Sequence, residues 1–253
     1  MLSPLKAVEK VGRSFHFFCR TATSVAVAPK KEWRFRIPLL IEQILRAGLM
    51  STPIVLLFAG LVGIILVLQT AFQLAQFGRV EMVGALVGVS VTREMGPLMT
   101  AIIVSGRVGA AFTAELGTMK VNDEILAAET MAIDPIQFLV VPRFLALIIV
   151  LPCLTTLSDI SALVFALLTG ASLFDVPQMT FMGVAQDWIQ TSDILVGGLK
   201  SAVFGALIAH ICCFEAFHLK GGASSVGTAT MRAVVLSMVA VLAADAVFAY
   251  FTI

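Results

Sequence analysis

The chain has 253 residues, of which 59% are hydrophobic and 13% are charged, and its formal net charge is +1. A soluble domain carries about 25% charged and about 45–50% apolar residues. A chain of this length cannot hide the excess apolar surface in a core of its own, so we expect lipid to be its solvent. The near-neutral charge gives no reason to expect an acidic partner such as nucleic acid.

The first 49 residues predict two short interfacial helices. Between residues 5 and 20, apolar residues recur every three or four positions, and basic residues fall mostly on the opposite face. A basic amphipathic helix of this kind lies in the membrane interface, and packing against a soluble partner is the alternative. A second short helix is expected to open at Pro38. Residues 1–28 lack an uninterrupted apolar core, so no signal peptide is expected.

Five long apolar stretches follow, and a helical span needs about 20 residues. They cover roughly residues 50–75, 82–113, 137–173, 194–217 and 228–253. The predicted fold class is therefore an all-α integral membrane protein, with residues 50–253 as a five-helix membrane domain. Nine of the 17 Lys and Arg residues precede position 50. By the positive-inside rule the N-terminus is cytoplasmic, and five crossings put the C-terminus outside.

The connection between the second and third spans predicts a cytoplasmic helix at about residues 115–133. Within this segment Asn122 fits the N-cap of a short helix, acids follow in its first turn, and Pro135 comes after its end. Its exposed side mixes charges with a methionine, which suits docking in a groove of a soluble partner. An ordinary connecting helix is the alternative, and composition does not decide between them. The candidate docking residues are Glu115, Lys120, Asp123, Glu124, Glu129 and Met131.

Several ionisable residues fall inside the spans, where charge is costly and often functional. At 1.5 Å per residue, Arg93, Glu94, Lys200 and Asp245 share one layer in the outer half of the membrane, with Asp159 near the same depth. Arg93 and Glu94 are helical neighbours that point apart, so their partners must be other helices or a ligand. This layer either holds a lipid headgroup or forms structural ion pairs between packed helices.

Motifs for cofactors and catalysis are missing. No Gly is followed by Lys, so the chain has no P-loop, and a separate subunit would have to bind ATP and Mg²⁺. No metal site and no cofactor are expected in this chain. Ser105 and His210 could form an intramembrane catalytic pair, but Ser105 lacks the Gly-x-Ser-x-Gly context of a hydrolase nucleophile.

Several motifs, in fixed order, occupy the second span and the segments after it. They are Arg93-Glu94-Met95-Gly96-Pro97-Leu98, Ser105-Gly106-Arg107-Val108-Gly109-Ala110-Ala111, Ala114-Glu115-Leu116-Gly117-Thr118-Met119-Lys120, Met131-Ala132-Ile133-Asp134-Pro135 and Val141-Pro142-Arg143. Together they resemble the MlaE family, the permeases of MCE-associated ABC transporters. The later connection, Lys220 to Val235, is similar too, so the resemblance covers nearly the whole chain. Asp159 matches no position of the family pattern.

The resemblance implies a homodimer in the bacterial inner membrane, with each protomer docked on a cytoplasmic ABC ATPase through the helix after the second span. It also implies a periplasmic MCE-domain protein, usually a hexamer, and in some systems a STAS-domain subunit. The implied cargo is phospholipid or another hydrophobic molecule, moved between the inner and outer membranes. Arg93-Glu94 matches a charged pair near an outward-opening cavity between the protomers. A stand-alone ion-coupled transporter and an intramembrane lipid enzyme remain the alternatives.

Overall fold

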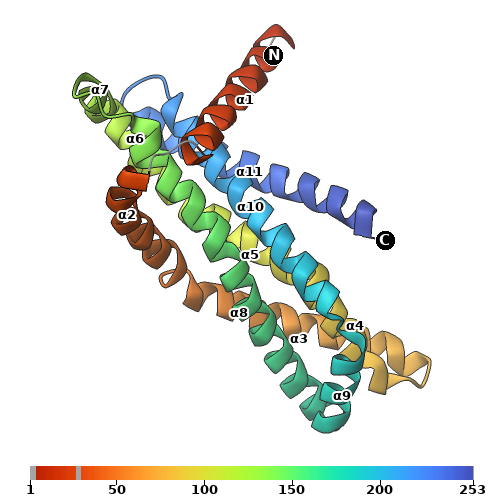
Figure 1. Ribbon diagram of the computed structural model, residues 1–253. Coiled ribbons are helices and arrows are strands. Elements are labelled where there is room, and N and C mark those ends of the chain that lie inside the picture. Colours follow the sequence, from red (N-terminus) through yellow and green to blue (C-terminus); the bar gives the residue numbers. More distant parts are fainter. Residues whose placement is uncertain (1–3, 27–29, 253) are drawn as a thin grey trace.

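The computed structural model describes residues 4–26 and 30–252, and within these ranges all regular structure is helical (Figure 1). The α-helices are α1 (Pro4–Ala26), α2 (Lys30–Gly48), α3 (Thr52–Gln76), α4 (Val83–Ser90), α5 (Gly96–Val104), α6 (Ala110–Val121), α7 (Glu124–Thr130), α8 (Val141–Leu173), α9 (Gln178–Trp188), α10 (Thr191–Phe217) and α11 (Ala223–Thr252). A 3₁₀ turn, η1 (Val80–Met82), and three π-helical turns, η2 (Val91–Met95), η3 (Ser105–Gly109) and η4 (Ile136–Val140), join some of them.

In the part of the chain that the structure describes, five helical segments are long and apolar enough to cross a membrane. They are Ile37–Gln76, Val80–Val121, Ile136–Leu173, Thr191–Phe217 and Ala223–Phe251. The prediction of an all-α membrane protein with five spans is confirmed. The second span is longer than expected, because α4, η2, α5, η3 and α6 follow one another without a break. The predicted helix start at Pro38 is wrong, since α2 begins at Lys30 and contains the proline.

The connections gather at two ends of the bundle, which we call the α7 end and the α9 end. Helix α7 and the turn between α10 and α11 lie at the α7 end, while α9 contacts η1 at the other (Figure 1). Helix α1 runs across the α7 end rather than along the spans. The connections therefore alternate between the two ends, as five consecutive crossings require.

Helix α8 lies at the centre of the packing and contacts α2, α3, α5 and α10. Two glycines allow the backbones of α10 and α3 to contact the backbone of α8. A Cβ at Gly205 of α10 would lie 2.5 Å from the Leu147 carbonyl oxygen, and a Cβ at Gly63 of α3 would overlap the carbonyl of Ala162. Small residues at such contacts let membrane helices approach closely enough for van der Waals attraction, which holds them together in lipid.

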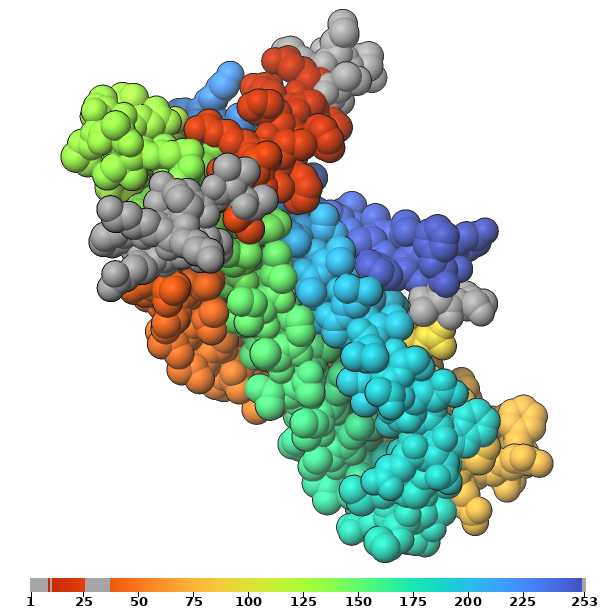
Figure 2. Space-filling model, in the orientation of Figure 1, coloured from red at the N-terminus to blue at the C-terminus, as the bar shows by residue number. Residues whose placement is uncertain are grey.

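Helix α11 is the least enclosed of the spans. It packs against α10 and α6, and its other faces leave large apolar side chains exposed, including Met231 (72%), Val239 (58%) and Tyr250 (79%). Figure 2 shows this helix projecting from the rest of the molecule. Exposed apolar surface on this scale needs lipid or another protein chain to cover it.

Candidate functional site

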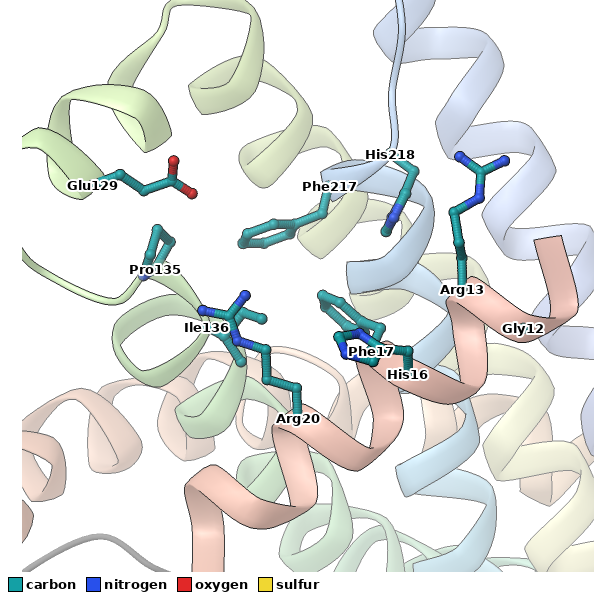
Figure 3. Close-up of a pocket in the computed structure, with 10 residues that line it drawn as sticks. All are labelled: Gly12, Arg13, His16, Phe17, Arg20, Glu129, Pro135, Ile136, Phe217 and His218. Atoms are coloured by element: carbon teal, nitrogen blue, oxygen red, sulfur yellow. The ribbon is translucent and has the colours of Figure 1, made fainter. Parts of the chain in front are cut away.

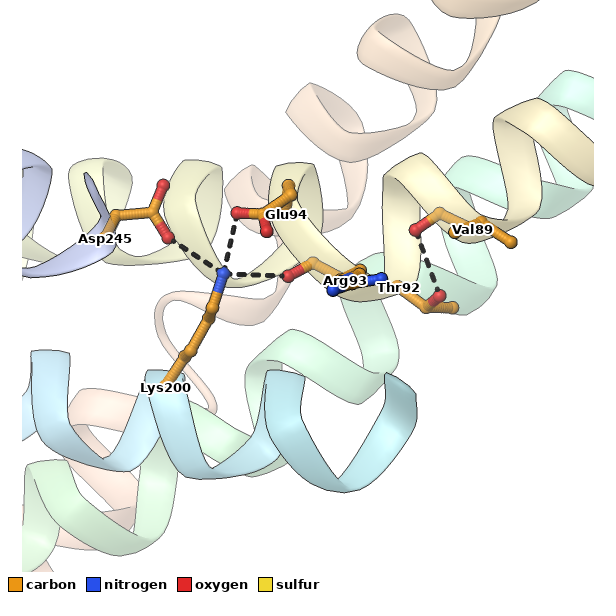
Figure 4. A network of polar contacts seen from close by, with 6 residues as sticks. All are labelled: Val89, Thr92, Arg93, Glu94, Lys200 and Asp245. Atoms are coloured by element: carbon orange, nitrogen blue, oxygen red, sulfur yellow. Dashed lines mark hydrogen bonds and ion pairs between the residues drawn. The ribbon is translucent and has the colours of Figure 1, made fainter. Parts of the chain in front are cut away.

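The structure brings two of the in-span carboxylates to Lys200 (Figure 4). The Lys200 Nζ donates hydrogen bonds to Glu94 Oε2 at 2.7 Å and to Asp245 Oδ1 at 3.2 Å. A third bond, of 3.3 Å, goes to the backbone carbonyl of Arg93. An ammonium group has three donors, so these partners saturate Lys200. The cluster joins η2, α10 and α11, and residues assigned to one layer by counting along the spans are in direct contact.

The Arg93 carbonyl can accept from Lys200 because of the residue four positions later. Pro97 has no N–H, so it cannot make the α-helical bond back to Arg93. The helix passes through η2, where the N–H of Gly96 bonds instead to the carbonyl of Val91. Such π-helical turns are rare and are frequently found at functional sites. The sequence motif around Pro97 thus creates the third acceptor of the cluster.

A glycine lets α10 come close enough to η2 for these bonds to form. A Cβ at Gly197 would lie 2.5 Å from the Thr92 carbonyl oxygen, whereas a Cβ at the neighbouring Gly198 would meet nothing within 4 Å. Lys200 lies nearly one turn after Gly197, on the side of α10 that contacts η2. The close helix contact therefore positions the ammonium group.

Burial decides which group of the cluster a ligand could reach. The side chains of Lys200, Asp245 and Glu94 are 0%, 14% and 30% exposed. Two carboxylates around one ammonium leave these three side chains with a formal charge of −1. Desolvation of such charges costs several kcal/mol, and the ion pairs offset that cost. The reachable polar group is the carboxylate of Glu94. Arg93 enters this network through its backbone carbonyl.

The docking candidates lie at the α7 end, but they do not form one helix. Asp123 has a φ of 57°, in the left-handed region, so the helix breaks there. The predicted N-cap role of Asn122 is therefore wrong: Asn122 is the C-cap of α6, and Asp123 is the N-cap of α7. Segment 115–133 consists of the last turns of α6 and a separate short helix. Lys120 and Asp123 are both exposed beside this break.

Helix α7 is anchored by one buried side chain and exposes the rest. Ile125 is 2% exposed and packs into a core cluster with Leu116 and residues of α1, η4 and α10. Leu126 and Met131 are 55% and 66% exposed, and Glu124 and Glu129 are exposed as well. Figure 2 shows the segment as a knob at one end of the molecule. Its surface combines apolar side chains with acids and lies outside the five spans.

Two arginines from other helices hold the carboxylate of Glu115, the first of the docking candidates. Its Oε1 accepts a 2.8 Å bond from Arg46, and its Oε2 accepts a 3.0 Å bond from Arg143. Arg143 also donates to the Leu139 carbonyl and lies over the ring of Phe112. These pairs tie α6 to α2 and α8. The partners are 69 and 28 residues away in sequence, so local spacing could not reveal them.

A cavity of about 350 Å³ opens at the α7 end between α1, α7, η4 and α10 (Figure 3). The two arginines that line it have acidic partners: Arg13 pairs with Glu9 at 3.4 Å, and Arg20 bonds to Asp134 at 3.2 Å. Sequence patterns did not point to this cavity. The lining residues are Gly12, Arg13, His16, Phe17, Arg20, Glu129, Pro135, Ile136, Phe217 and His218.

Helix α1 is attached through aromatic and polar contacts with α10. Phe17 is 6% exposed and packs against the ring of Phe214, and Ser14 bonds to His210 at 2.9 Å. Val11 and Phe15, which belong to the apolar face predicted from spacing, are 69% and 68% exposed. Phe18, from the same predicted face, packs edge-on against His210. Spacing missed Phe17, which is buried and holds the helix in place.

The structure does not form the catalytic pair considered from the sequence. Ser105 bonds to Ser237 at 2.5 Å, and His210 bonds to Ser14. Among the residues described, no group of three or more His, Cys, Asp or Glu side chains could hold a metal ion. The two members of the considered pair thus bond to different helices, Ser105 to α11 and His210 to α1.

Comparison with known proteins identifies the family. The profile of the permease MlaE family matches residues 40–251. A probable ABC transporter permease protein of Synechocystis is 38% identical over 201 residues, covering 79% of this chain and 76% of the relative. One from Rickettsia felis is 34% identical over 238 residues, covering 94% and 90%. The chloroplastic TRIGALACTOSYLDIACYLGLYCEROL 1 protein of Arabidopsis thaliana is 33% identical over 222 residues, covering 88% and 62%. The chain belongs to the MlaE permease family and is a multi-pass transport subunit rather than a catalytic enzyme.

Proposed function

We propose that this permease moves phospholipid or another hydrophobic molecule between the inner and outer membranes, as a homodimer powered by a separate ABC ATPase. ATP and Mg²⁺ bind to that ATPase, an MCE-domain protein sits on the periplasmic side, and some systems add a STAS-domain subunit. The observation that carries the proposal is the Lys200 cluster, a desolvated charge network whose Glu94 carboxylate is still reachable. The lipid name carried by the Arabidopsis relative favours a lipid cargo.

In this proposal Arg93 and Glu94 line an outward-facing cavity between the two protomers, and the cargo headgroup meets them there. Lys200 and Asp245 hold the turn that presents these residues. A headgroup can bind only to a group it can reach, and Glu94 is the most exposed side chain of the cluster. The exposed apolar side chains of α11 provide surface for a second protomer or for lipid.

The α7 end is cytoplasmic in this proposal, which puts the N-terminus inside the cell and the C-terminus in the periplasm. Exposed Leu126 and Met131 beside Glu124 and Glu129 suit a groove on the ATPase that is apolar at its base and basic at its edges. Ile125 packs in the same core cluster as residues of α10, so a displacement of α7 by the ATPase is transmitted to that membrane span.

Photocrosslinking tests the cargo site. A photoreactive amino acid at position 94 should capture lipid from the membrane much more efficiently than one at Leu57, an apolar α3 residue that is 61% exposed. Position 57 reports random contact with membrane lipid. Equal lipid labelling at the two positions would contradict a specific cargo site at Glu94.

Charge reversal on α7 tests coupling to the ATPase. The pair Glu124→Lys and Glu129→Lys should abolish copurification of the ATPase and reduce lipid transfer at least tenfold, with the permease still inserted in normal amounts. Asp187→Lys, an exposed acid on α9 at the other end of the bundle, is the control and should change neither. Transfer that persists without any ATPase would favour an ion-coupled transporter instead.

A further inference from the structure

We infer that Asp159, Thr100 and Thr155 form a buried site between α5 and α8 that binds one ordered water molecule. The oxygen Oδ1 of Asp159 is buried without a hydrogen-bond partner, as are the hydroxyl oxygens of Thr100 and Thr155. The two threonines are 0% and 2% exposed. A buried polar group without a partner costs about 1–3 kcal/mol, so three of them together indicate a ligand that satisfies them.

Helix register places the three residues at one contact between α5 and α8. A Cβ at Gly96 would overlap Asp159 Oδ1, so this oxygen lies directly against the backbone of α5. Helices α5 and α8 run in opposite directions between the two ends of the bundle. One turn toward the α7 end from Gly96 is Thr100, and one turn toward the same end from Asp159 is Thr155. The two threonines therefore face the contact between α5 and α8 at the same level.

The hydroxyl groups of Thr100 and Thr155 differ from those of other helical threonines in this chain. Thr92, Thr113 and Thr169 each donate to the carbonyl four residues earlier, at 3.0, 3.0 and 2.8 Å. This local bond is available to any helical threonine and normally satisfies its hydroxyl in lipid. Thr100 and Thr155 make no such bond, so their hydroxyls are free to bind something else.

The number and type of the three unpaired oxygens indicate which ligand the site binds. A buried water makes about three hydrogen bonds, and here three oxygens are available. A Ca²⁺ ion needs about six to eight oxygen ligands, more than these side chains offer. No cation contacts Asp159 among the described residues. An uncompensated carboxylate in a membrane span is costly, so in this site Asp159 is the neutral acid, and its O–H donates a hydrogen bond to the water.

The site lies directly behind the Lys200 cluster. Gly96, against which Asp159 packs, directly follows η2, and the same turn supplies Glu94 and the Arg93 carbonyl to Lys200. The water therefore fixes the start of α5, just after η2, to α8, while Lys200 fixes η2 to α10. This inference concerns the folding of the second span and holds whatever the transported molecule is.

A double-mutant cycle in the purified full-length protein tests the shared water. Thr100→Val and Thr155→Val should each lower the melting temperature by about 2–4 °C. The double variant should melt at nearly the same temperature as the worse single variant, because the first change already expels the water. Thr169→Val, a back-bonded threonine of the same helix, is the control and should add its effect to that of Thr155→Val. Additive effects of Thr100→Val and Thr155→Val would overturn the inference.

Changes at Asp159 test the ligand. Asp159→Asn keeps the shape, one acceptor and a donor, so the melting temperature should stay within about 2 °C of the wild type. Asp159→Leu should lower it by more than either threonine change. A metal-ion site would behave differently. NaCl, compared with choline chloride at equal ionic strength, would stabilise the wild type and not Asp159→Asn, and that result would overturn the assignment to water.

Discussion

At the scale of single residues, Lys200 shows how a membrane span accommodates charge. Its ammonium group is fully buried, and each of its three donors has an acceptor. The cost of removing a partner is asymmetric. Loss of the lysine leaves two carboxylates facing each other without a counter-charge, whereas loss of one carboxylate still leaves the lysine one carboxylate and a carbonyl.

Lys200→Met should therefore lower the free energy of unfolding by on the order of 3–5 kcal/mol, the range for breaking a buried ion pair. Glu94→Gln and Asp245→Asn should each cost clearly less, since both keep a polar group beside the ammonium. Thermal unfolding in detergent measures all three variants. Adding both amide changes to Lys200→Met should restore part of the stability. A Lys200→Met protein as stable as the wild type would show that the cluster contributes no structural energy.

At the scale of elements, the second span owes its shape to backbone features. Two π-helical turns interrupt its α-helix, one around Arg93 and one around Arg107. Arg107 donates a 2.8 Å bond to Ser51, in the turn between α2 and α3. Each π-helical turn thus carries an arginine that bonds to another element, one through its backbone carbonyl and the other through its guanidinium.

Neighbouring glycines of α10 should respond to alanine with opposite signs. Gly197→Ala places a Cβ against the Thr92 carbonyl, which is backbone and cannot turn away, so we expect a loss of about 1–3 kcal/mol. Gly198→Ala adds a methyl group in open space and restricts the unfolded chain, so we expect no change or a gain of about 0.5–1 kcal/mol. Thermal unfolding of the two purified variants checks both signs. Equal effects would mean that α10 does not touch η2.

At the scale of the whole molecule, the bundle has two distinct ends and a wide apolar surface. The α7 end carries α1, the ion pairs of Glu115 and the cavity beneath α1, whereas α9 covers the opposite end. The exposed apolar residues of α3 and α11 lie between the ends. This distribution suits a protein that meets different partners on the two sides of a membrane.

Cysteine labelling in cells should establish which end faces the cytoplasm. Cys19 and Cys153 are exposed and would first be replaced by alanine, while Cys212 and Cys213 are buried and can stay. With the proposed orientation, a membrane-impermeant maleimide should label Met179→Cys of α9 in intact cells, and Asn122→Cys at the α7 end only after the inner membrane is opened. The reverse pattern would invert the proposed topology.

Much of the architecture could be predicted because hydropathy is a local property. Five apolar stretches of sufficient length require five helices in lipid, where each backbone group must find its partner within the helix. The boundaries were less accurate. The apolar pattern ends near residue 113, yet the helix continues to Val121 because Leu116 is buried in the core near the α7 end. The predicted helix start at Pro38 was wrong because the residues around a proline look the same whether it lies in the first turn of a helix or inside the helix.

The fold class and the number of spans could be predicted from the chain alone, because length and hydropathy are local properties. Which charged residues touch could not be predicted in this way, and the packing of the helices establishes it. The packing paired Glu115 with two distant arginines, placed Lys200 between Glu94 and Asp245, and set Asp159 against Gly96. These contacts depend on how the helices rotate and approach one another. That arrangement follows from packing between residues far apart in the chain, and a one-dimensional pattern cannot specify it.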